Sequence, residues 1–417
     1  MKSKTELTEH RPHRIKFPLL LLTKVLITVL TSGKFALAGD ESSSAQLLGD
    51  WGGVRTSLED FGITVESILT VDFIRNVHGA IDKDSSVLGN YDLIFNADTE
   101  AMTLWHGGTL SVYLLGNAND GTLPSQFIGD LQASDNIEAD EALKVYEAWY
   151  EQSFLDNQLG LLFGLHDYNS EFYVLEYAAT LINSSFGIGP DSSQVIPSIF
   201  PTSSLALRVR LHPSEKSYLL AAVYDGIPGD PNNPRGTHIK LKSKDGLFYG
   251  LEAGLLGEEG PSYYKAGLGF WYHTAEFEDF AGVMRDENHG LYFIGEKNLF
   301  TEQDQAQGLG AFFQLGFTRE SRNQTEQYLG AGLAYTGAIP TRDADVLSVG
   351  IAHARNGSEY QTSMNADTAE TAIELIYRSE ITPYFSISPD IQWIMDPGTV
   401  KEVDDALVLG VRVEVAM

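Results

Sequence analysis

The sequence predicts an all-β fold, a transmembrane antiparallel up-and-down β-barrel of about 16 strands with a short N-terminal amphipathic helix. Three observations lead to this prediction. Apolar and polar residues alternate with a period of two along most of the 417-residue chain. The connections between the alternating segments are mostly long and short in turn. The polar face of many segments is charged, which suits a water-filled lumen and not a packed core.

Residues 1–38 differ in composition from the rest and are predicted to be a secretory signal peptide. Basic residues precede the apolar run "FPLLLLTKVLITVL", and Ala36–Ala38 supplies the small-x-small pattern of a cleavage site. A single membrane-spanning helix is the alternative, but Lys24 interrupts the run and the cleavage site follows it. No later apolar run approaches about 18 residues, so strands would have to cross any membrane.

Residues 39–61 are predicted to be a periplasmic segment that leads into the barrel. In "GDWGGVRTSLEDFG", Val54, Leu58 and Phe61 recur at helical spacing after Asp50, a residue type that often caps a helix. This spacing predicts the short amphipathic helix. A glycine-rich phosphate site is the alternative, but the stretch has neither the P-loop lysine nor a preceding strand.

Period-2 alternation predicts the strands of the barrel domain, 62–417. In "LALRVRL", Arg208 and Arg210 lie on the face opposite the leucines. Most segments are close to the roughly 9–11 residues that a tilted transmembrane strand needs. The predicted strands are 62–75, 90–99, 109–116, 144–154, 158–166, 204–212, 217–225, 246–257, 263–273, 289–296, 309–318, 328–336, 346–354, 371–379, 383–395 and 406–416.

The predicted connections are sorted by length. The long ones include 76–89, 117–143, 167–203 and 274–288, whereas the tight turns "LDNQ", "HPSEKS" and "SEITP" all fall in the other set. An up-and-down barrel with long loops at one rim and short turns at the other has this pattern. A soluble sandwich has no reason to sort its loops in this way.

Several polar strand faces are too charged for a packed interior. They indicate a polar lumen, which a barrel of about 16 strands is wide enough to hold. These faces are Asp92/Asn96/Asp98, Arg208/Arg210, Glu374/Arg378 and Asp390/Gln392.

Composition excludes several other classes of protein. The net charge of −29 argues against nucleic acid as a partner. The absence of cysteine excludes disulfides, thiolate metal sites and a cysteine nucleophile. The histidines are scattered, and HExxH, GxSxG and GxxxxGK[ST] motifs do not occur. We therefore predict a protein that is not an enzyme, with no cofactor and no metal; a barrel hydrolase is the alternative without support from residue spacing.

Eight stretches resemble the carbohydrate-selective (OprB-type) porins. The resemblance implies a sixteen-stranded porin that lets mono- and oligosaccharides diffuse across the outer membrane of a Gram-negative-type bacterium. One departure is Met417, because outer-membrane barrels typically end in an aromatic residue. In the order of that family, the stretches are "GDWGGVR", "GDLQASDNIEA", "VYEAWYEQSF", "NSEFYVLEYAATLINSSFGIGPD", "PSIFP", "DGIPGDPNNPRGTH", "ITPYFSISPDIQWIMDPG" and "DALVLGVRVEV".

The connections 117–143 and 167–203 are the two long enough to fold inward and narrow the lumen. Passage of a sugar needs paired donors and acceptors, aromatic faces and weak binding. For each predicted charge the alternative is a solvated lumen group that only sets the electric field, and for each tyrosine it is packing. Trp149 is expected to face lipid or the interface. The predicted pore-lining residues are Asp167, Tyr168, Glu171, Tyr173, Arg208, Arg210 and Lys265.

The stretch "DGIPGDPNNPRGTH", residues 225–238, is predicted to be a structural loop. Its acids and asparagines miss the alternate spacing of a calcium loop, and no glutamate closes it. Its three prolines remove N–H groups that a phosphate cradle would need. Consecutive turns, with an adventitious calcium site as the alternative, explain its composition.

Two other functions remain open beside the carbohydrate pore. The acidic charge would suit a general or cation-preferring diffusion porin, and a plugged barrel would suit a structural role. The expected partners are sugars as transported solutes, outer-membrane lipid and lipopolysaccharide, and the barrel-assembly machinery. An oligomer is possible, and no nucleic acid is expected.

Overall fold

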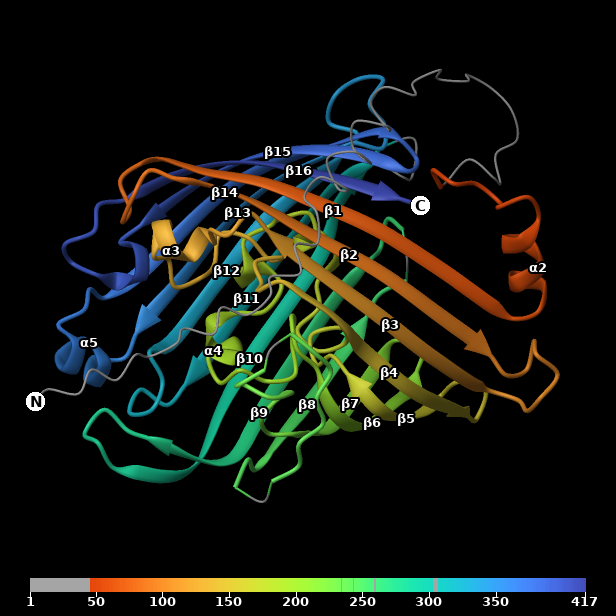
Figure 1. The fold of residues 1–417 in the computed structure, drawn as a ribbon, viewed down its shortest axis with the longest axis horizontal. Coiled ribbons are helices and arrows are strands. Elements are labelled where there is room, and N and C mark those ends of the chain that lie inside the picture. Colours follow the sequence, from red (N-terminus) through yellow and green to blue (C-terminus); the bar gives the residue numbers. More distant parts are fainter. Residues whose placement is uncertain (1–45, 234, 243, 259, 303–306) are drawn as a thin grey trace, which may run out of the picture. The chain divides into compact units, whose positions relative to one another are not determined.

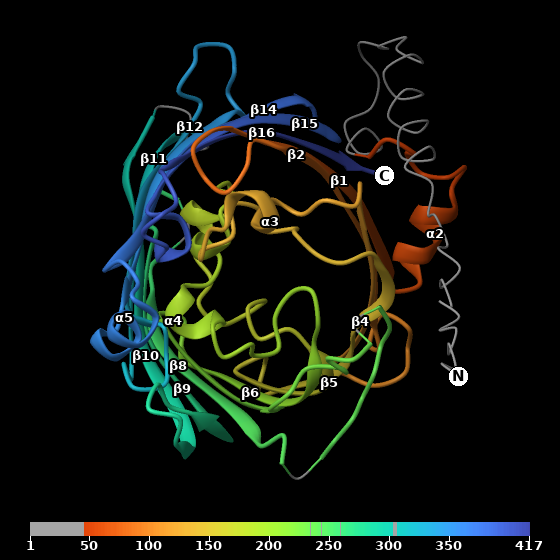
Figure 2. The ribbon, with the colours of Figure 1, turned by 60° about the vertical axis from the view of Figure 1, so that its left-hand side comes forward.

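The computed structural model describes residues 46–417 except 234, 243, 259 and 303–306. The predicted signal peptide, 1–38, lies outside the described residues. The described residues belong to one compact unit, Asp40–Met417, in which sixteen antiparallel strands form a closed barrel (Figures 1 and 2). The predicted barrel is therefore confirmed. Its strands are β1 (Ile63–His78), β2 (Ser85–Asp98), β3 (Gly108–Asn119), β4 (Ala142–Phe154), β5 (Leu159–His166), β6 (Ser204–Ser214), β7 (Ser217–Asp225), β8 (Leu247–Leu256), β9 (Tyr264–Glu278), β10 (Met284–Thr301), β11 (Gly308–Thr318), β12 (Thr325–Thr336), β13 (Val346–Asn356), β14 (Ala369–Thr382), β15 (Phe385–Met395) and β16 (Ala406–Ala416).

Each strand pairs with its neighbours in chain order, and β1 pairs with β16 to close the barrel. The seam runs in register from Ile68 opposite Ala416 to Asn76 opposite Val408. Closure leaves no free strand edge, so the strands satisfy their backbone hydrogen bonds within the wall. This is the arrangement that a β protein needs to cross a bilayer.

Alternation along each strand separates two surfaces. Side chains such as Phe73, Phe293 and Leu409 point outward and are more than 40 % exposed. Their neighbours on the other face, such as Asp72, Tyr292 and Val408, are buried. An apolar outer face with polar groups inside is the reverse of a soluble barrel, because lipid and not water surrounds the wall.

Some strands run beyond their predicted limits. The connection between β1 and β2 covers 79–84 and not the predicted 76–89. The connection between β9 and β10 covers 279–283 and not the predicted 274–288. The backbone ladder continues there through polar residues, as between Asp286 and Glu276. Apolar alternation marks only the part of a strand that meets lipid, whereas hydrogen bonding between strands continues into water.

The long connections that remain leave the same rim of the barrel. They are 120–141, 167–203 and 226–246. The first two lie inside the ring of strands, together with the short helices α3 (Pro124–Ile128) and α4 (Pro190–Ser193) (Figure 2). Another helix, α5 (Ser358–Met364), connects β13 to β14. Among the described residues, no helix has the length and apolar character needed to cross a membrane.

A short helix, α2 (Val54–Asp60), precedes β1 and lies near the ends of β1 and β2 where the short turns are (Figure 1). Its N-cap residue is Gly53, and not Asp50 as predicted; Asp50 instead accepts a hydrogen bond from the Thr56 N–H at 2.8 Å. The predicted apolar face also differs, because Val54 and Phe61 are both more than half exposed. The side chain that the helix buries is Arg55.

Arg55 connects α2 to both strands of the barrel seam, at the end of the seam where β1 begins. It donates hydrogen bonds to the carbonyl oxygens of Val65 and Met417, each at 3.0 Å. Its guanidinium lies 4.3 Å from the ring centroid of Trp51, a cation–π contact. These bonds satisfy one carbonyl near the start of β1 and one just after β16.

Candidate functional site

The connection 167–203 is held to the inner wall by carboxylates of the strands. Glu252 on β8 accepts hydrogen bonds from the Tyr173 N–H at 2.9 Å and from the Tyr292 hydroxyl at 2.6 Å. Glu296 on β10 accepts one from the Tyr177 N–H at 2.9 Å. Backbone N–H groups of this connection, which in a strand or helix would bond to other backbone groups, thus bond to side chains of the wall.

Further along, the same connection is bound by side chains of β11, β12 and β14. Glu374 on β14 accepts hydrogen bonds from the N–H groups of Ile182 and Asn183, at 2.7 and 2.9 Å. The Tyr328 hydroxyl donates to the Ser185 carbonyl at 2.8 Å, and the Gln314 amide donates to a carbonyl beside it. The connection therefore follows the inner wall from β8 to β14.

The connection 120–141 uses the same kind of anchor. Glu370 on β14 accepts hydrogen bonds from the N–H groups of Leu131, Gln132 and Gly398, at 2.6 to 2.9 Å. The two inward connections also pair with each other, because the Asn136 N–H donates to the Ile182 carbonyl at 2.8 Å. We call the inner face of β8–β14, with the carboxylates Glu252, Glu296, Glu370 and Glu374, the anchored wall.

Tyr168 and Tyr173, two of the predicted pore-lining residues, are wholly buried. The ring of Tyr168 stacks on Phe172 with centroids 4.5 Å apart, and that of Tyr173 lies 4.3 Å from Tyr292. The Tyr173 hydroxyl donates to Asp191 at 3.0 Å. In the structure these rings pack the connection against the wall and offer no open face for sugar stacking.

Arg208 contacts the predicted acid Glu171 directly, and Arg208 and Arg210 share Glu151, a carboxylate that the sequence analysis did not single out. Glu151 on β4 accepts a hydrogen bond from Arg208 at 2.6 Å and forms an ion pair with Arg210. Arg208 also donates to Glu171 at 2.7 Å. The side chain of Arg208 is 1 % exposed, whereas those of Arg210 and Glu171 are 34 % and 22 % exposed. Arg210 and Glu171 are therefore the partly exposed members of this cluster.

Lys265 and Asp167 are occupied by neighbours. The Lys265 ammonium donates to the Val174 carbonyl at 2.7 Å, so it is a further anchor for the inward connection. Asp167 accepts a hydrogen bond from the Tyr146 hydroxyl at 2.7 Å. Burial raises the pKa of Asp167 to about 6, against the opposing effect of this hydrogen bond and those from backbone N–H groups.

Trp149 faces the lumen, which contradicts the expectation that it faces lipid or the interface. Its indole N–H donates to Glu147 at 3.1 Å, and Glu147 in turn accepts from the Asp167 N–H inside the barrel. The pairing of β3 with β4 shifts register between Tyr113 and Leu114. This bulge on β4 reverses the alternation that the sequence pattern assumes, and so it turns Trp149 inward.

Tyr113 is a second half-buried lumen aromatic that the sequence analysis missed. Its hydroxyl donates to Asp92 at 2.6 Å, and its ring meets Tyr146 edge-on at 5.1 Å. The available signal was that Tyr113 shares a face of β3 with the polar residues Ser111 and Asn117. We call the inner face of β2–β6 the open wall; its half-buried side chains are Asp92, Tyr113, Trp149, Glu171 (from the connection) and Arg210.

The predicted structural loop lies within the connection 226–246, between β7 and β8. Asp230 accepts a hydrogen bond from the Asn232 N–H at 3.2 Å and also pairs with Lys240. The Thr237 hydroxyl donates to the Val145 carbonyl at 2.8 Å, which holds the loop to β4. Across the part of the chain that the structure describes, no group of three or more histidines and acids could hold a metal ion.

A closed barrel with an apolar outer face, a polar inner wall and connections folded into its interior defines a porin. The profile of the carbohydrate-selective porin, OprB family, matches residues 82–417. The chain therefore belongs to this family, and it is an outer-membrane carbohydrate porin of Gram-negative type. Channel activity, and not enzymatic activity, is what this membership implies.

Individual relatives agree with this assignment. Porin B of Pseudomonas aeruginosa is 24% identical over 437 aligned residues, which cover 92% of this chain and 94% of that protein. The high-pH structure of Pseudomonas putida OprB superposes with a TM-score of 0.82 at 21% identity and covers 91% of this chain and 100% of that one. The low-pH structure of the same protein gives a TM-score of 0.61 at 18% identity, with the same coverage. At these identities the solved structures support the fold.

Proposed function

We propose that mono- and oligosaccharides pass along the open wall, between the half-buried aromatic rings of Trp149 and Tyr113 and the charged pair Arg210 and Glu171. The observation that carries this proposal is the contrast in occupancy of the two walls. The carboxylates of the anchored wall already accept hydrogen bonds from loop backbone. The open wall keeps an aromatic and a charged group of each sign partly exposed.

These groups match the chemistry of a sugar. A pyranose ring has an apolar face that stacks on an aromatic ring, and its hydroxyls both donate and accept hydrogen bonds. Arg210 supplies donors only and Glu171 acceptors only. Each contact replaces water without holding the solute tightly, because the groups are half-buried and already share their charge with partners.

A general diffusion porin that prefers cations is the second candidate. It is favoured by the net charge of −29 and by Asp92 and Glu171 on the open wall. Such a pore would pass solutes according to size and charge, without regard to hydroxyl groups. We further propose that the chain catalyses no reaction.

The test is solute entry into proteoliposomes that contain the folded protein, comparing sugars with amino acids and salts of matched size. We expect faster entry of sugars, and block of ionic conductance by added sugar. Entry that follows size and charge alone, with a reversal potential that favours cations, would support the general porin instead. No entry through folded protein would indicate a plugged barrel.

A matched pair of tryptophan variants sharpens this test. Trp149→Ala should weaken the sugar block of conductance by roughly fivefold, since aromatic contacts of this kind contribute about 1 kcal/mol. Trp393→Ala is the control, because Trp393 lies on β15 with its side chain 52% exposed on the outer face. Equal sugar block in both variants would remove Trp149 from the solute path.

Three further features complete the proposal. Residues 1–38 are removed as a signal peptide on export, and α2 lies on the periplasmic side. The barrel reaches the outer membrane through the barrel-assembly machinery and contacts phospholipid and lipopolysaccharide there. Whether copies associate is tested by the mass of the protein in detergent, in which a trimer would indicate contact through the outer face.

A further inference from the structure

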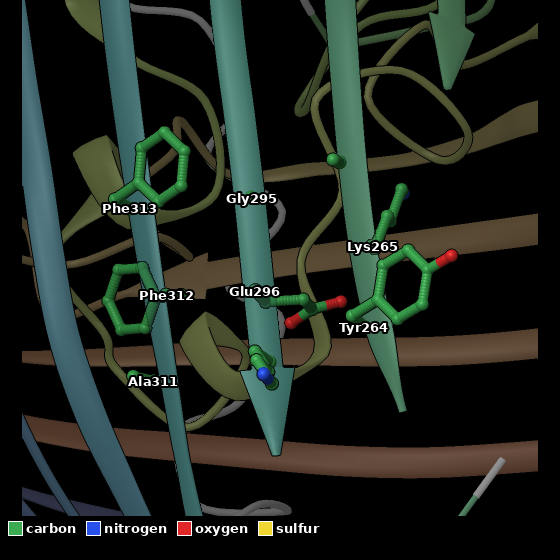
Figure 3. A pocket seen from close by; sticks show the side chains of 9 residues that line it. Tyr264, Lys265, Gly295, Glu296, Ala311, Phe312 and Phe313 are labelled. Atoms are coloured by element: carbon green, nitrogen blue, oxygen red, sulfur yellow. The ribbon is translucent and has the colours of Figure 1, made fainter. Parts of the chain in front are cut away.

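A pocket of about 440 Å³ lies on β9, β10 and β11, far from the open wall in strand order. Figure 3 shows Gly295 on the middle strand, between Phe313 on one neighbouring strand and Tyr264 on the other. The volume of the pocket falls in the range of about 300–1,000 Å³ that is typical of ligand pockets. The lining residues are Tyr264, Lys265, Ala266, Gly295, Glu296, Lys297, Ala311, Phe312 and Phe313.

The open side of this pocket faces away from the lumen. Lys265 and Glu296 bond to the inward connection 167–203, and Phe312 meets Phe186 of that connection edge-on. These three side chains therefore point inward. Strand alternation then places the other lining residues on the outer surface, which in a membrane barrel faces lipid.

Small residues make the hollow. Ala266 pairs with Gly295 across β9 and β10, and Gly295 pairs with Phe313 on β11. The adjacent row toward the middle of the wall carries Leu268 and Phe293, both exposed and large. The hollow ends there against apolar side chains, so its inner end is apolar, as a hydrocarbon chain requires.

Lys297 places a positive charge at the mouth of the hollow. It pairs with Tyr264, the first residue of β9, and with Ala311 on β11. β10 continues only to Thr301 and the short connection after it, so Lys297 lies near the rim of short turns. A lysine on the lipid face costs little near that interface, because its ammonium reaches the headgroups.

We propose that this pocket binds an anionic glycerophospholipid of the periplasmic leaflet. One acyl chain would lie over Ala266 and against the ring of Phe313, which covers Gly295, and the headgroup phosphate would meet the Lys297 ammonium and the Tyr264 hydroxyl. The short turns of outer-membrane barrels are periplasmic, which selects phospholipid and not lipopolysaccharide. The proposal rests on the membrane barrel but not on the sugar path, because the pocket and the open wall lie on opposite faces of the sheet.

Charge complementarity favours an anionic occupant such as a phospholipid headgroup. The protein carries 57 acidic and 28 basic residues, yet the charged side chain at this outward hollow is basic. No carboxylate among the residues that the structure describes forms an ion pair with Lys297. A headgroup phosphate would meet the Lys297 ammonium with opposite charge.

Native mass spectrometry of the full-length mature protein, titrated with phosphatidylglycerol in detergent, tests the proposal. We expect one tightly retained phosphatidylglycerol, and weaker retention of phosphatidylcholine and of lipopolysaccharide. Lys297→Gln should weaken retention of phosphatidylglycerol roughly fivefold. Ala266→Leu, or Ala311→Leu if that variant folds poorly, should weaken it while Lys297 remains. Arg75→Gln is the control. Arg75 is an exposed cation near the end of β1, at the rim opposite the one that carries Lys297.

Each other outcome overturns the proposal. Retention of phosphatidylglycerol by Lys297→Gln and Ala266→Leu at the level of the unmodified protein would show that the hollow holds no lipid. Preferred retention of lipopolysaccharide would mean that the pocket lies in the outer leaflet and not, as proposed, in the periplasmic leaflet. Loss of dimer or trimer mass in Ala266→Leu, with lipid retention unchanged, would assign the face to a second copy. Sugar entry into proteoliposomes should be normal in all variants, and this readout separates failure here from failure of the sugar path.

Discussion

The anchored wall of β8–β14 and the open wall of β2–β6 carry similar residue types but use them differently. On the anchored wall, Glu252 and Glu374 are 0 % exposed and accept hydrogen bonds from the backbone of an inward connection. On the open wall, Arg210 and Glu171 keep about a third and a fifth of their side-chain surface exposed. A charge on a lumen face is therefore not by itself a charge that a solute meets.

The difference follows from the path of one connection. Residues 167–203 leave β5 and cross the inner faces of β8, β10 and β14 before they return to β6. A connection inside a barrel must pair its N–H groups, and carboxylates on the wall are strong acceptors for them. The wall that the connection covers supplies anchors, and the wall that it leaves free can contact solute.

Removal of one anchor should have the largest effect. Glu374→Ala leaves the N–H groups of Ile182 and Asn183 buried without their acceptor, at a cost of about 2–6 kcal/mol. We expect the connection to detach from β14 and the single-channel conductance in planar bilayers to rise. Glu276→Ala is the control, because Glu276 is an exposed glutamate on β9. Unchanged conductance in Glu374→Ala would mean that the remaining anchors suffice to set the bore.

The open wall itself contains a buried charge that should matter for folding. Arg208→Ala leaves Glu151 and Glu171 without their shared partner, and loss of one member of a buried ion pair costs about 3–5 kcal/mol. Arg210→Ala should cost only about 0–1 kcal/mol, because Arg210 is one-third exposed. Urea unfolding of the two variants in lipid measures the difference. A smaller loss for Arg208 than for Arg210 would contradict this assignment of roles.

The barrel seam should show an intermediate effect. Arg55→Ala removes two hydrogen bonds, to the carbonyls of Val65 and Met417, and should lower the free energy of unfolding by about 1–3 kcal/mol. Arg55→Lys should not restore it, since one ammonium lacks the fork geometry of guanidinium. Glu59→Ala, an exposed change on the same helix, is the control. Equal thermal stability of Arg55→Ala and Glu59→Ala would show that α2 adds nothing to the seam.

The smallest effect concerns the pH dependence of ion flow. The pKa of Asp167 is raised to about 6 by burial, so the carboxyl is neutral below pH 6 and charged above it. Cation preference, measured by reversal potential, should therefore rise slightly between pH 5 and pH 7. The free energy of unfolding should fall between the usual carboxyl pKa, near 4, and pH 6, because the folded state binds this proton more tightly.

Asp167→Asn should remove the part of both pH profiles that this carboxyl causes. The substitution keeps the size of the side chain and an acceptor for the Tyr146 hydroxyl. Profiles identical to those of the unmodified protein would assign the titration to another carboxyl. Asp191, whose pKa burial also raises to about 6, would be the next residue to change.

Much of the barrel could be predicted from the sequence, because a strand in a bilayer must alternate lipid-facing and lumen-facing residues. The segment Leu409–Glu414 shows this alternation without any knowledge of its partners, because apolar residues at 409, 411 and 413 alternate with Gly410, Arg412 and Glu414. The length of 167–203 predicted it as an inward segment, because only a long connection can reach into the lumen. The limits of β9 and β10 were less accessible, because hydrogen bonding continues where hydropathy no longer alternates.

The sequence by itself determined the strand pattern, the charged lumen face and the long connections, since each of these is a property of neighbouring residues. Only the tertiary structure decided which lumen groups are free. Glu374 meets Ile182 across 192 positions of the chain, and no local pattern encodes such a contact. The inward orientation of Trp149 depends on a register shift against β3. Contacts between distant segments, and not residue types, therefore separate anchors from groups that can meet a solute.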